Sequence, residues 1–451
     1  MKIIMTFAAR FSTAFLFVVS ALVSINAQTT TPFDFSAQAA AVTEFDVNGL
    51  KVILKRRPSS PTVAGGLFIR GGARNIDDKS AGIENLMLAS AIEAGVKMPR
   101  AVVRRELARL GVGISSGTSN DYSAVSLVST RANFDRVWEI FSEVMLNPAF
   151  ATADIDLNRE RILTGLREAG SSPESALEEM ENHIIFAGHP YANDVSGTPA
   201  NIGRFTPAEL REYHKSVMQT SKLLFVFVGD IDPDQLKSRI AATFGKLPRG
   251  DYKEKSLPAI DFSKGTLNVT QRILPTNYIQ GVFAAPSPRD PDYYAMRVAT
   301  SILQALVNQE VRVKRQLSYA PSADMDSNAA NTANISVSTT DANQAVAVML
   351  QQIKFLQTQK LNDEVIDEIA AFFLTKYYLG QETSAAQVGE LARYELVGGG
   401  WRNSFEFLKG VREVTPAQVM AVSNKYMKNI RFAVVGDEKS LDRSIFIPTG
   451  E

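Results

Sequence analysis

The strongest constraint on the fold is a pattern that occurs twice in the chain. Thr206-Pro207-Ala208 opens a helical segment that leads to an apolar strand ending at Gly229-Asp230, and Thr415-Pro416-Ala417 opens another that ends at Gly436-Asp437. In each copy Thr is a favourable N-cap, and Pro suits the first helical position, where no backbone N–H is needed. The copies lie about 210 residues apart, far beyond the period of a solenoid repeat. The sequence therefore predicts one α+β unit that has been duplicated.

Hydrophobic patterning locates the elements of the first unit. Strands are predicted at 44–55, at 63–70 and in alternation between 112 and 130, and helices at 80–95, 99–110, 133–146, 153–169 and 173–187. Because strands and grouped helices interleave without regular βαβ winding, we expect two α+β domains with mainly antiparallel sheet flanked by helices. The expected organisation is 1–27 signal peptide, 28–245 N-terminal domain, 246–265 charged, Pro/Gly-punctuated linker, and 266–451 C-terminal domain.

Composition supports this division and limits the possible partners. A chain of 451 residues is too long for one ordinary core. Lys plus Arg and Asp plus Glu number 48 each, so no net field favours nucleic acid or an anionic membrane. Lys2 and Arg10 precede an apolar run at 11–23 and the small residue Ala27, which is the order of a secretory signal peptide cleaved near Ala27. The alternative is an uncleaved signal anchor. The absence of cysteine excludes disulfides and thiolate metal ligands.

Two further stretches carry a family resemblance. Residues 82–89 read Gly-Ile-Glu-Asn-Leu-Met-Leu-Ala at the start of an apolar-striped helix. His189-Pro190-Tyr191 is followed by Ser-Gly-Thr-Pro-Ala-Asn-Ile at 196–202, and then by the first Thr-Pro helix and Val-Gly-Asp strand. Each piece alone is a weak signal, but their order resembles the insulinase/pitrilysin superfamily of zinc peptidases, in its mitochondrial-processing-peptidase-like branch. The resemblance covers nearly the whole chain after the signal segment, and it implies two homologous α+β domains forming a half-chamber.

The inverted zinc motif of that family is missing at the matching positions. The resemblance implies histidine ligands at 85 and 89, one helical turn apart, and a glutamate general base at 88. This chain has Asn85, Leu88 and Ala89 there, and Arg167 where the resemblance implies the third, glutamate ligand. Zinc lowers the pKa of a bound water to roughly 7, whereas without zinc the pKa of water stays far above that value. That difference corresponds to about 12 kcal/mol of lost nucleophile activation. We therefore expect no zinc and no proteolysis from this chain alone.

One element of the family is retained in the second half. Arg312 and Tyr319 stand at the two positions where the resemblance implies an arginine at a helix end and a tyrosine that reach towards substrate. The guanidinium offers a rigid fork of donors and the phenol a hydroxyl on a stiff ring. Together they can hold a peptide carbonyl or stabilise charge developing on it. Residue types alone favour the alternative, a surface cation beside Lys314 and Arg315 with a half-buried strand tyrosine; the resemblance favours the pair.

Three other features have weaker interpretations. His189 is predicted to order its turn through the neighbouring Pro-Tyr. His214, which lies among charged residues, is predicted to be a solvated residue on a helix face. Residues 111–117, which contain three glycines, can form a sheet edge for strand addition by an extended peptide, although glycines more often serve chain geometry alone.

These inferences lead to a secreted or periplasmic, non-catalytic, substrate-binding subunit of a heterodimeric zinc metallopeptidase that acts on peptides or unfolded segments. The resemblance implies a homologous partner subunit that bears the zinc, to whose active site this chain contributes Arg312 and Tyr319. No cofactor is expected on this chain, no nucleic-acid partner, and no membrane span in the mature chain. The alternatives are a non-proteolytic structural or peptide-binding protein of the same fold, and a lone peptidase with an unconventional metal site. Peptide specificity and the choice between homodimer and heterodimer are left open.

Overall fold

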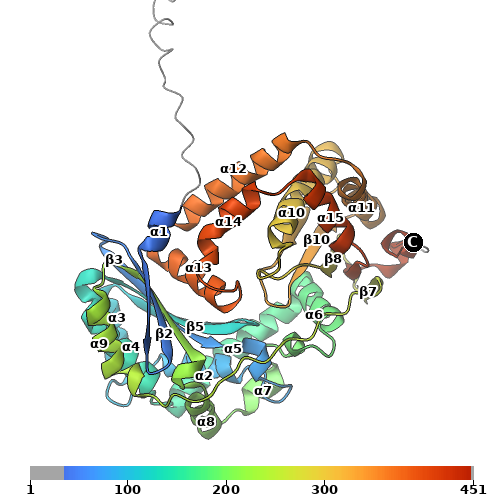
Figure 1. Cartoon of the computed structure of the whole chain (residues 1–451). Coiled ribbons are helices and arrows are strands. Elements are labelled where there is room, and N and C mark those ends of the chain that lie inside the picture. The colour runs from blue at the N-terminus through green and yellow to red at the C-terminus, as the bar shows by residue number, and fades with distance from the viewer. Residues whose placement is uncertain (1–34, 448–451) are drawn as a thin grey trace, which may run out of the picture.

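Two β-sheets organise the chain in the computed structural model, which describes residues 35–447 (Figure 1). The first sheet has the strand order β1-β2-β6-β3-β5-β4 and the second the order β7-β11-β8-β10-β9. The strands are β1 (Val42–Val47), β2 (Leu50–Arg56), β3 (Thr62–Arg70), β4 (Gly113–Thr118), β5 (Tyr122–Thr130), β6 (Leu223–Gly229), β7 (Thr266–Gln271), β8 (Asn277–Ala284), β9 (Ser322–Met325), β10 (Thr332–Thr339) and β11 (Arg431–Gly436).

Strand pairing repeats between the two sheets. The parallel pair β2–β6 corresponds to β7–β11, and the antiparallel run β6-β3-β5-β4 corresponds to β11-β8-β10-β9. Strand β1 is an addition at the edge of the first sheet. Each sheet is therefore mainly antiparallel with one parallel pair, and the prediction of two homologous α+β units is confirmed.

The helices also follow the sequence closely. They are α1 (Ser36–Ala40), α2 (Ile83–Ala91), α3 (Arg100–Leu110), α4 (Phe134–Leu146), α5 (Thr152–Ser171), α6 (Pro173–Ile185), α7 (Pro199–Arg204), α8 (Pro207–Val217), α9 (Pro233–Ala242), α10 (Tyr293–Val307), α11 (Ala342–Thr358), α12 (Asp363–Gly380), α13 (Ser384–Leu396), α14 (Asn403–Arg412), α15 (Pro416–Tyr426) and α16 (Arg443–Phe446). Both α8 and α15 begin with a capping box, Thr206 with Glu209 and Thr415 with Gln418, as the duplicated Thr-Pro pattern suggests.

The predicted single strand at 44–55 is wrong, because two strands occupy that stretch. Strands β1 and β2 pair antiparallel, with Val47 opposite Leu50. Asn48 and Gly49 between them both have positive φ, 55° and 86°. Asn-Gly is the dipeptide that favours a two-residue hairpin turn of this kind.

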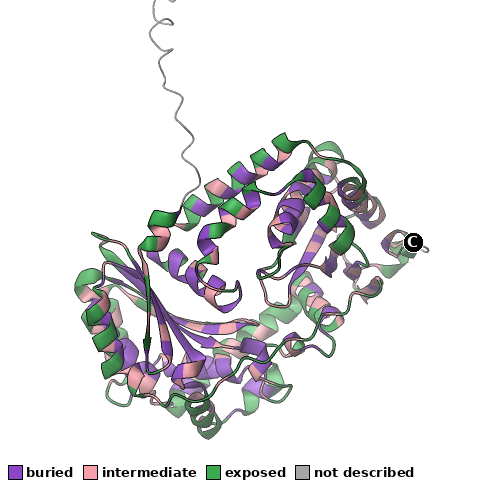
Figure 2. Cartoon of the chain, in the orientation of Figure 1, coloured by how far each residue is buried: buried purple, intermediate pink, exposed green. Residues whose placement is uncertain are grey.

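Each sheet is covered on one face by its own helices and on the other by a helix from the opposite half. Helices α2, α4 and α8 pack on the first sheet, and α10, α11 and α15 on the second. Val388 and Leu391 of α13 lie in one core cluster with Phe68 of the first sheet, while Leu177 of α6 packs on Val435 of the second. Figure 2 shows the central strands of the first sheet buried between these layers. The two halves are therefore joined by exchanged helices.

The predicted linker contains no helix or strand from 247 to 265. It is nevertheless anchored to the first half, since Tyr252 N–H donates to Ser221 Oγ at 3.2 Å and Glu254 pairs with Arg74. In Figure 1 it runs as a yellow-green trace from the first half to β7. The domain boundaries remain predictions, and the predicted signal peptide lies outside the described residues.

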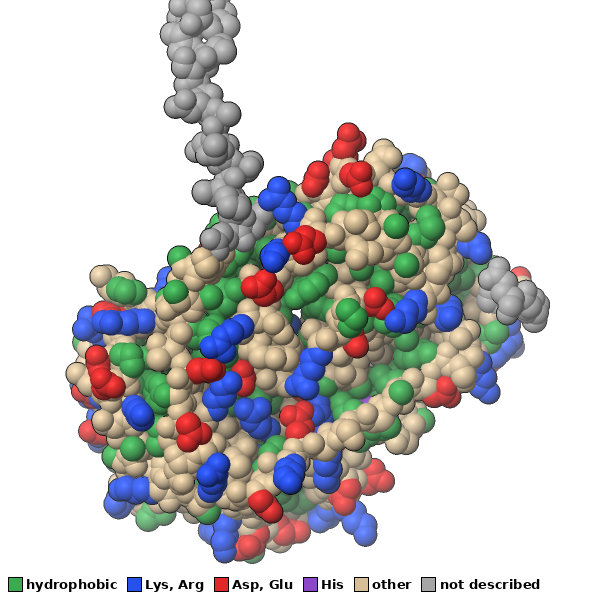
Figure 3. All heavy atoms as spheres, viewed as in Figure 1, with side chains coloured by type: hydrophobic (Ala, Val, Ile, Leu, Met, Phe, Trp, Pro, Cys, Tyr) green, Lys and Arg blue, Asp and Glu red, His purple; other side chains and the backbone are tan. Residues whose placement is uncertain are grey.

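Charge is distributed as the composition suggests. Figure 3 shows basic and acidic side chains interspersed over the visible face. Within residues 35–447, no helix is long and apolar enough to cross a membrane.

Candidate functional site

Two segments that carry the family resemblance meet at the start of α2. Gly82, its N-cap, has φ 85°, and a Cβ built on it would lie 2.4 Å from Gly197 Cα, so only glycine fits this approach. The Asn85 side-chain amide donates to the Ser196 carbonyl at 3.0 Å. The stretches 82–89 and 196–202 are thus adjacent in space, and Asn85 fixes α2 to the loop before α7.

The positions of the missing zinc motif do not converge on a site. Asn85 and Ala89 are half-buried on one side of α2, whereas Leu88 is 1% exposed and belongs to the core of the first half. Arg167 on α5 is exposed, donates to Thr164 Oγ1 at 3.0 Å, and lies 3.9 Å from Glu160. No group of three or more His, Cys, Asp or Glu able to hold a metal occurs within residues 35–447.

A buried carboxylate that the sequence argument overlooked lies beside these positions. Glu84 is 5% exposed, and the Tyr213 hydroxyl donates to its Oε2 at 2.8 Å. Burial raises the pKa of Glu84, although the hydrogen bond from Tyr213 and the charge of Lys222 act against this. A cavity of about 10 Å³, lined by Glu84, Thr118 and Ser123 among others, adjoins it. The available signal was an acidic residue within the apolar stripe of the helix.

The histidines have structural roles. The His189 ring accepts the Tyr191 N–H at Nδ1, 3.1 Å away, so it orders the turn as predicted. The prediction that His214 is solvated is wrong. It is half-buried, its Nε2 lies 2.8 Å from the Met145 carbonyl, its ring packs edge-on against Phe150, and burial lowers its pKa. The charged neighbours of His214 suggested exposure, but the helix presents this residue inward.

Arg312 and Tyr319 lie together on the surface of the second half. The Arg312 guanidinium stands over the Tyr319 ring, 4.3 Å from its centroid, and Tyr319 is 80% exposed. Arg312 belongs to a π-helix, η7 (Asn308–Lys314), a rare geometry that often marks functional positions. Lys314 and Arg315 both pair with Glu310, whereas Arg312 makes no ion pair or hydrogen bond with any residue in 35–447. Arg312 therefore differs from its neighbouring cations, and the strand-like burial of Tyr319 is not observed.

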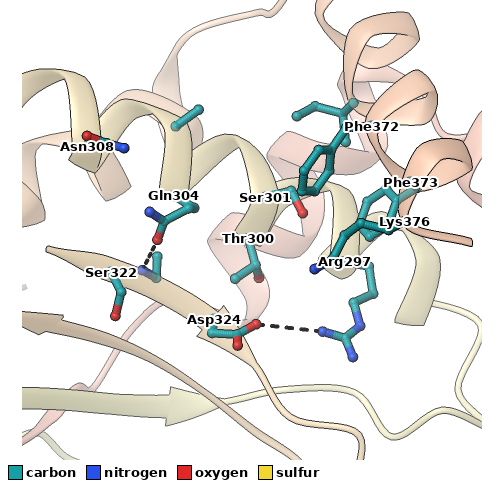
Figure 4. A pocket seen from close by; sticks show the side chains of 13 residues that line it. Arg297, Thr300, Ser301, Gln304, Asn308, Ser322, Asp324, Phe372, Phe373 and Lys376 are labelled. Carbon is teal, nitrogen blue, oxygen red and sulfur yellow. Dashed lines mark hydrogen bonds and ion pairs between the residues drawn. The ribbon is translucent and has the colours of Figure 1, made fainter. Parts of the chain in front are cut away.

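A groove lies beside the outer strand of the second sheet. It has a volume of about 510 Å³ and lies between α10, β9 and α12 (Figure 4). One wall carries polar side chains from α10 and β9, and the other carries Phe372, Phe373 and Lys376 of α12. Within it the Gln304 side-chain oxygen accepts the Ala323 N–H of β9 at 2.6 Å.

Comparison with known proteins identifies the family. The model for insulinase, peptidase family M16, matches residues 51–199, and the model for the peptidase M16 inactive domain matches residues 204–372. This chain belongs to the M16 family. The matches support a non-catalytic peptidase-like fold.

The curated relatives are distant in sequence. The chain is 23% identical to an uncharacterized zinc protease of Mycobacterium leprae over 88% of this chain and 93% of that protein. It is 22% identical to bovine mitochondrial cytochrome b-c1 complex subunit 1, over 59% of this chain and 56% of that protein. It is also 22% identical to the mitochondrial-processing peptidase subunit beta of Caenorhabditis elegans, over 57% and 56%. The last two matches span about half of those relatives.

Solved structures show the same fold. A peptidase M16 inactive domain from Pseudomonas fluorescens superposes with TM-score 0.80 at 20% identity, covering 88% of this chain and 98% of that one. The first half of the periplasmic protease PqqL from Escherichia coli gives TM-score 0.73 at 16% identity, covering 90% and 95%.

Proposed function

We propose that this chain is the non-catalytic, substrate-binding subunit of a heterodimeric zinc metallopeptidase that acts on peptides or unfolded segments. The observation that carries the proposal is the contrast between two sets of positions. Of the positions that would hold zinc, Leu88 is packed in the core and Asn85 is hydrogen-bonded to Ser196. Arg312 and Tyr319, by contrast, are exposed and adjacent, and neither side chain has another ion pair or hydrogen bond within residues 35–447. In this proposal the partner is a homologous subunit that holds zinc and the general base, and Arg312 and Tyr319 contact the peptide carbonyl in the partner's active site.

The first sheet offers a surface for an extended peptide. The Ser119 N–H donates to the carbonyl of Tyr122 directly opposite, so the backbone groups of Ser119 point towards β5. Because this direction alternates along an antiparallel strand, the backbone groups of Ile114, Ser116 and Thr118 point away from the sheet. None of these groups has a hydrogen-bond partner within residues 35–447. Gly113 and Gly117 on the alternate face leave open space where a Cβ would stand. A peptide can therefore add to β4 as a further strand without displacing a side chain.

Other relatives bear on the location and the partner. The E. coli neighbour is a periplasmic protease, and the nematode relative is a mitochondrial-processing peptidase subunit. With the signal-like order of residues 1–27, this supports a periplasmic or secreted location for the proposed heterodimer.

The test is turnover of a peptide by the reconstituted pair. If both side chains contact the developing oxyanion, Tyr319→Phe and Arg312→Lys should each lower kcat by ~100- to 1000-fold, because each removes a donor that acts in the transition state. Arg315→Lys is the matched control, because Arg315 already pairs with Glu310 and should leave kcat unchanged. Size-exclusion chromatography verifies that each variant still assembles. Full activity of both Tyr319→Phe and Arg312→Lys in assembled complexes would remove this chain from the chemistry.

A second candidate is a non-proteolytic peptide-binding protein, and the groove beside β9 favours it. The groove combines an aromatic wall with hydroxyl and amide groups, the usual composition of a binding site, and needs no partner. Binding of labelled unfolded peptides to the isolated chain, weakened at least tenfold by Phe372→Ala and unaffected by Tyr319→Phe, would support this candidate. The reverse pattern would support the first.

A further inference from the structure

The groove beside β9 has the dimensions of a short peptide site. The residues of α10 that line it run from Arg297 to Asn308, a length of about 16 Å at the helical rise per residue. An extended peptide covers that length with about five residues. The volume of about 510 Å³ lies within the range of sites that bind ligands of this size. The groove is therefore large enough for a short segment with one large side chain.

The wall formed by α12 is apolar and open. Phe372 is 49% exposed, although its ring packs edge-on against Phe373 with 5.8 Å between the centroids. Ile369, one turn earlier on the helix, continues the same surface. Covering this wall with an apolar side chain of a ligand removes both surfaces from water, which favours binding.

The wall formed by α10 presents polar groups that are free to bind a ligand (Figure 4). The side chains of Ser301 and Asn308 have no hydrogen bond with any residue in 35–447. Gln304 uses its side-chain oxygen for the Ala323 N–H, and its amide nitrogen has no partner in the same range. Such donors and acceptors suit a peptide backbone. A fatty-acid chain would cover them without replacing their hydrogen bonds to water, which is unfavourable.

One of the two cations that line the groove has no counter-ion. Lys376 makes no ion pair or hydrogen bond with any residue in 35–447, and its ammonium lies 5.3 Å from the centroid of the Phe372 ring. Arg297, the other cation, donates to the Met325 carbonyl at 2.5 Å and lies 3.9 Å from Asp324. Arg297 and Asp324 offset each other, so the charge of Lys376 is unbalanced at this end of the groove.

We propose that the groove is a peptide subsite that selects a large apolar side chain with a carboxylate close by. The apolar side chain packs on Phe372, the peptide backbone bonds to the α10 wall, and Lys376 binds the carboxylate. Because the ammonium lies beside the Phe372 ring, the carboxylate belongs within about two residues of the apolar side chain. It can come from an acidic side chain or from the C terminus of the peptide. This selection rests on peptide binding in the groove, the second candidate function.

The test measures binding of short labelled peptides to the whole chain by fluorescence anisotropy. A peptide with Phe beside Glu in a Gly-Ser background is compared with peptides that carry Gln or Lys in place of that Glu. A second pair ends in Phe, with a free or an amidated C terminus. A carboxylate should tighten binding by about two- to fivefold over its uncharged counterpart, and the gain should shrink at high salt, as for a solvent-accessible ion pair. The pair with the larger gain identifies the source of the carboxylate.

Variants of Lys376 test its role in this preference. Lys376→Gln should remove the gain, and Lys376→Glu should reverse the order, so that the peptide with Lys binds more tightly than the peptide with Glu. Lys360→Glu is the matched control, because Lys360 is an exposed cation of the same half that does not line the groove. It should keep the wild-type order. Because Lys376 is exposed and makes no ion pair or hydrogen bond within residues 35–447, its variants should keep the urea midpoint of the wild type.

Phe372→Ala separates the selection from peptide binding itself. It should weaken all of these peptides by at least tenfold and leave the preference for a carboxylate in place. Equal binding of the Glu and Gln peptides together with equal binding of the free and amidated ones, or a preference that survives Lys376→Gln, would overturn the proposal but leave peptide binding in the groove intact. No binding of any peptide, or no effect of Phe372→Ala, would overturn both. Displacement of the peptide by an equal concentration of decanoate would assign the groove to a fatty acid and overturn the proposal as well.

Discussion

The outer strands β4 and β9 stand at equivalent ends of the two sheets but present different edges. The outward groups of β4 have no partner within residues 35–447, whereas most of those of β9 are occupied by side chains. Gln304 accepts the Ala323 N–H, Asp324 Oδ1 accepts the Met325 N–H at 2.7 Å, and Arg297 donates to the Met325 carbonyl. These contacts imitate those of an added strand and protect the β9 edge from pairing. One duplicated unit has therefore kept an edge that can accept a strand, and the other has closed it.

The two halves also differ in the empty volume next to their helices. In the first half α2 and its neighbours leave a cavity of about 10 Å³ beside Glu84. In the second half the space between α10, β9 and α12 is a groove of about 510 Å³. The α2 positions where the resemblance implies zinc ligands therefore lie in or beside the packed core, while the groove lies beside the protected β9 edge. The β4 edge is therefore suited to pairing with an added strand, whereas the groove is suited to binding the side chains of a ligand.

The largest expected effect tests whether α2 is a packing helix. Leu88→Glu should lower the free energy of unfolding by at least ~3 kcal/mol, because it removes a core side chain and buries an unpaired carboxylate. Ala89→His, at a half-buried position of the same helix, should cost less than ~1 kcal/mol. Urea unfolding at pH 7 measures both. Equal costs would mean that α2 retains an open, site-like face.

Glu84 gives the next test through pH. Its raised pKa means that it stabilises the fold while protonated, and this stability declines as pH rises from 4.5 through the raised value. Glu84→Gln keeps an acceptor for the Tyr213 hydroxyl but cannot ionise. Its urea midpoint should therefore decline less than that of wild type between pH 5 and 8. Parallel profiles would show that Glu84 does not titrate in the folded chain.

A smaller effect is expected from opening the β9 edge. Gln304→Ala should cost about 1 kcal/mol and leave the Ala323 N–H without its acceptor. Hydrogen exchange at Ala323 should then approach the rates of the outward amides of β4. Asn308→Ala, which lines the same groove without bonding to β9, is the control. Unchanged exchange at Ala323 in Gln304→Ala would show that Gln304 does not protect the edge.

The smallest effects compare the two capping boxes. Thr206→Ala and Thr415→Ala should each cost about 0.5–1 kcal/mol, because each removes an N-cap acceptor, and Thr→Ser at either position should cost less. Thermal unfolding measures the four variants. A cost confined to one half would show that the duplicated caps no longer contribute equally.

The duplication, the helix starts and the element types were accessible from sequence because they depend on local chemistry. Thr206 and Thr415 each cap a helix by accepting a hydrogen bond from the backbone N–H three residues further along the chain. Gly111 ends α3 with φ 65°, a conformation that glycine adopts readily. The hairpin at Asn48-Gly49 was missed because the apolar run around it masked the turn signal. His214 was misplaced because its burial depends on Phe150 and Met145, which are distant in sequence.

The sequence by itself supports the expectation that Asn85, Leu88 and Ala89 do not form the zinc site of the family, since leucine and alanine side chains offer no metal ligand. It also paired Arg312 with Tyr319 as an expectation. The local geometry of η7 distinguished Arg312 from Lys314 and Arg315, because it places Glu310 against those two cations and leaves Arg312 over the Tyr319 ring. Only the tertiary structure decided the surroundings of Glu84 and the protection of the β9 edge, because there the partners lie on different elements and meet only when the sheets and helices pack.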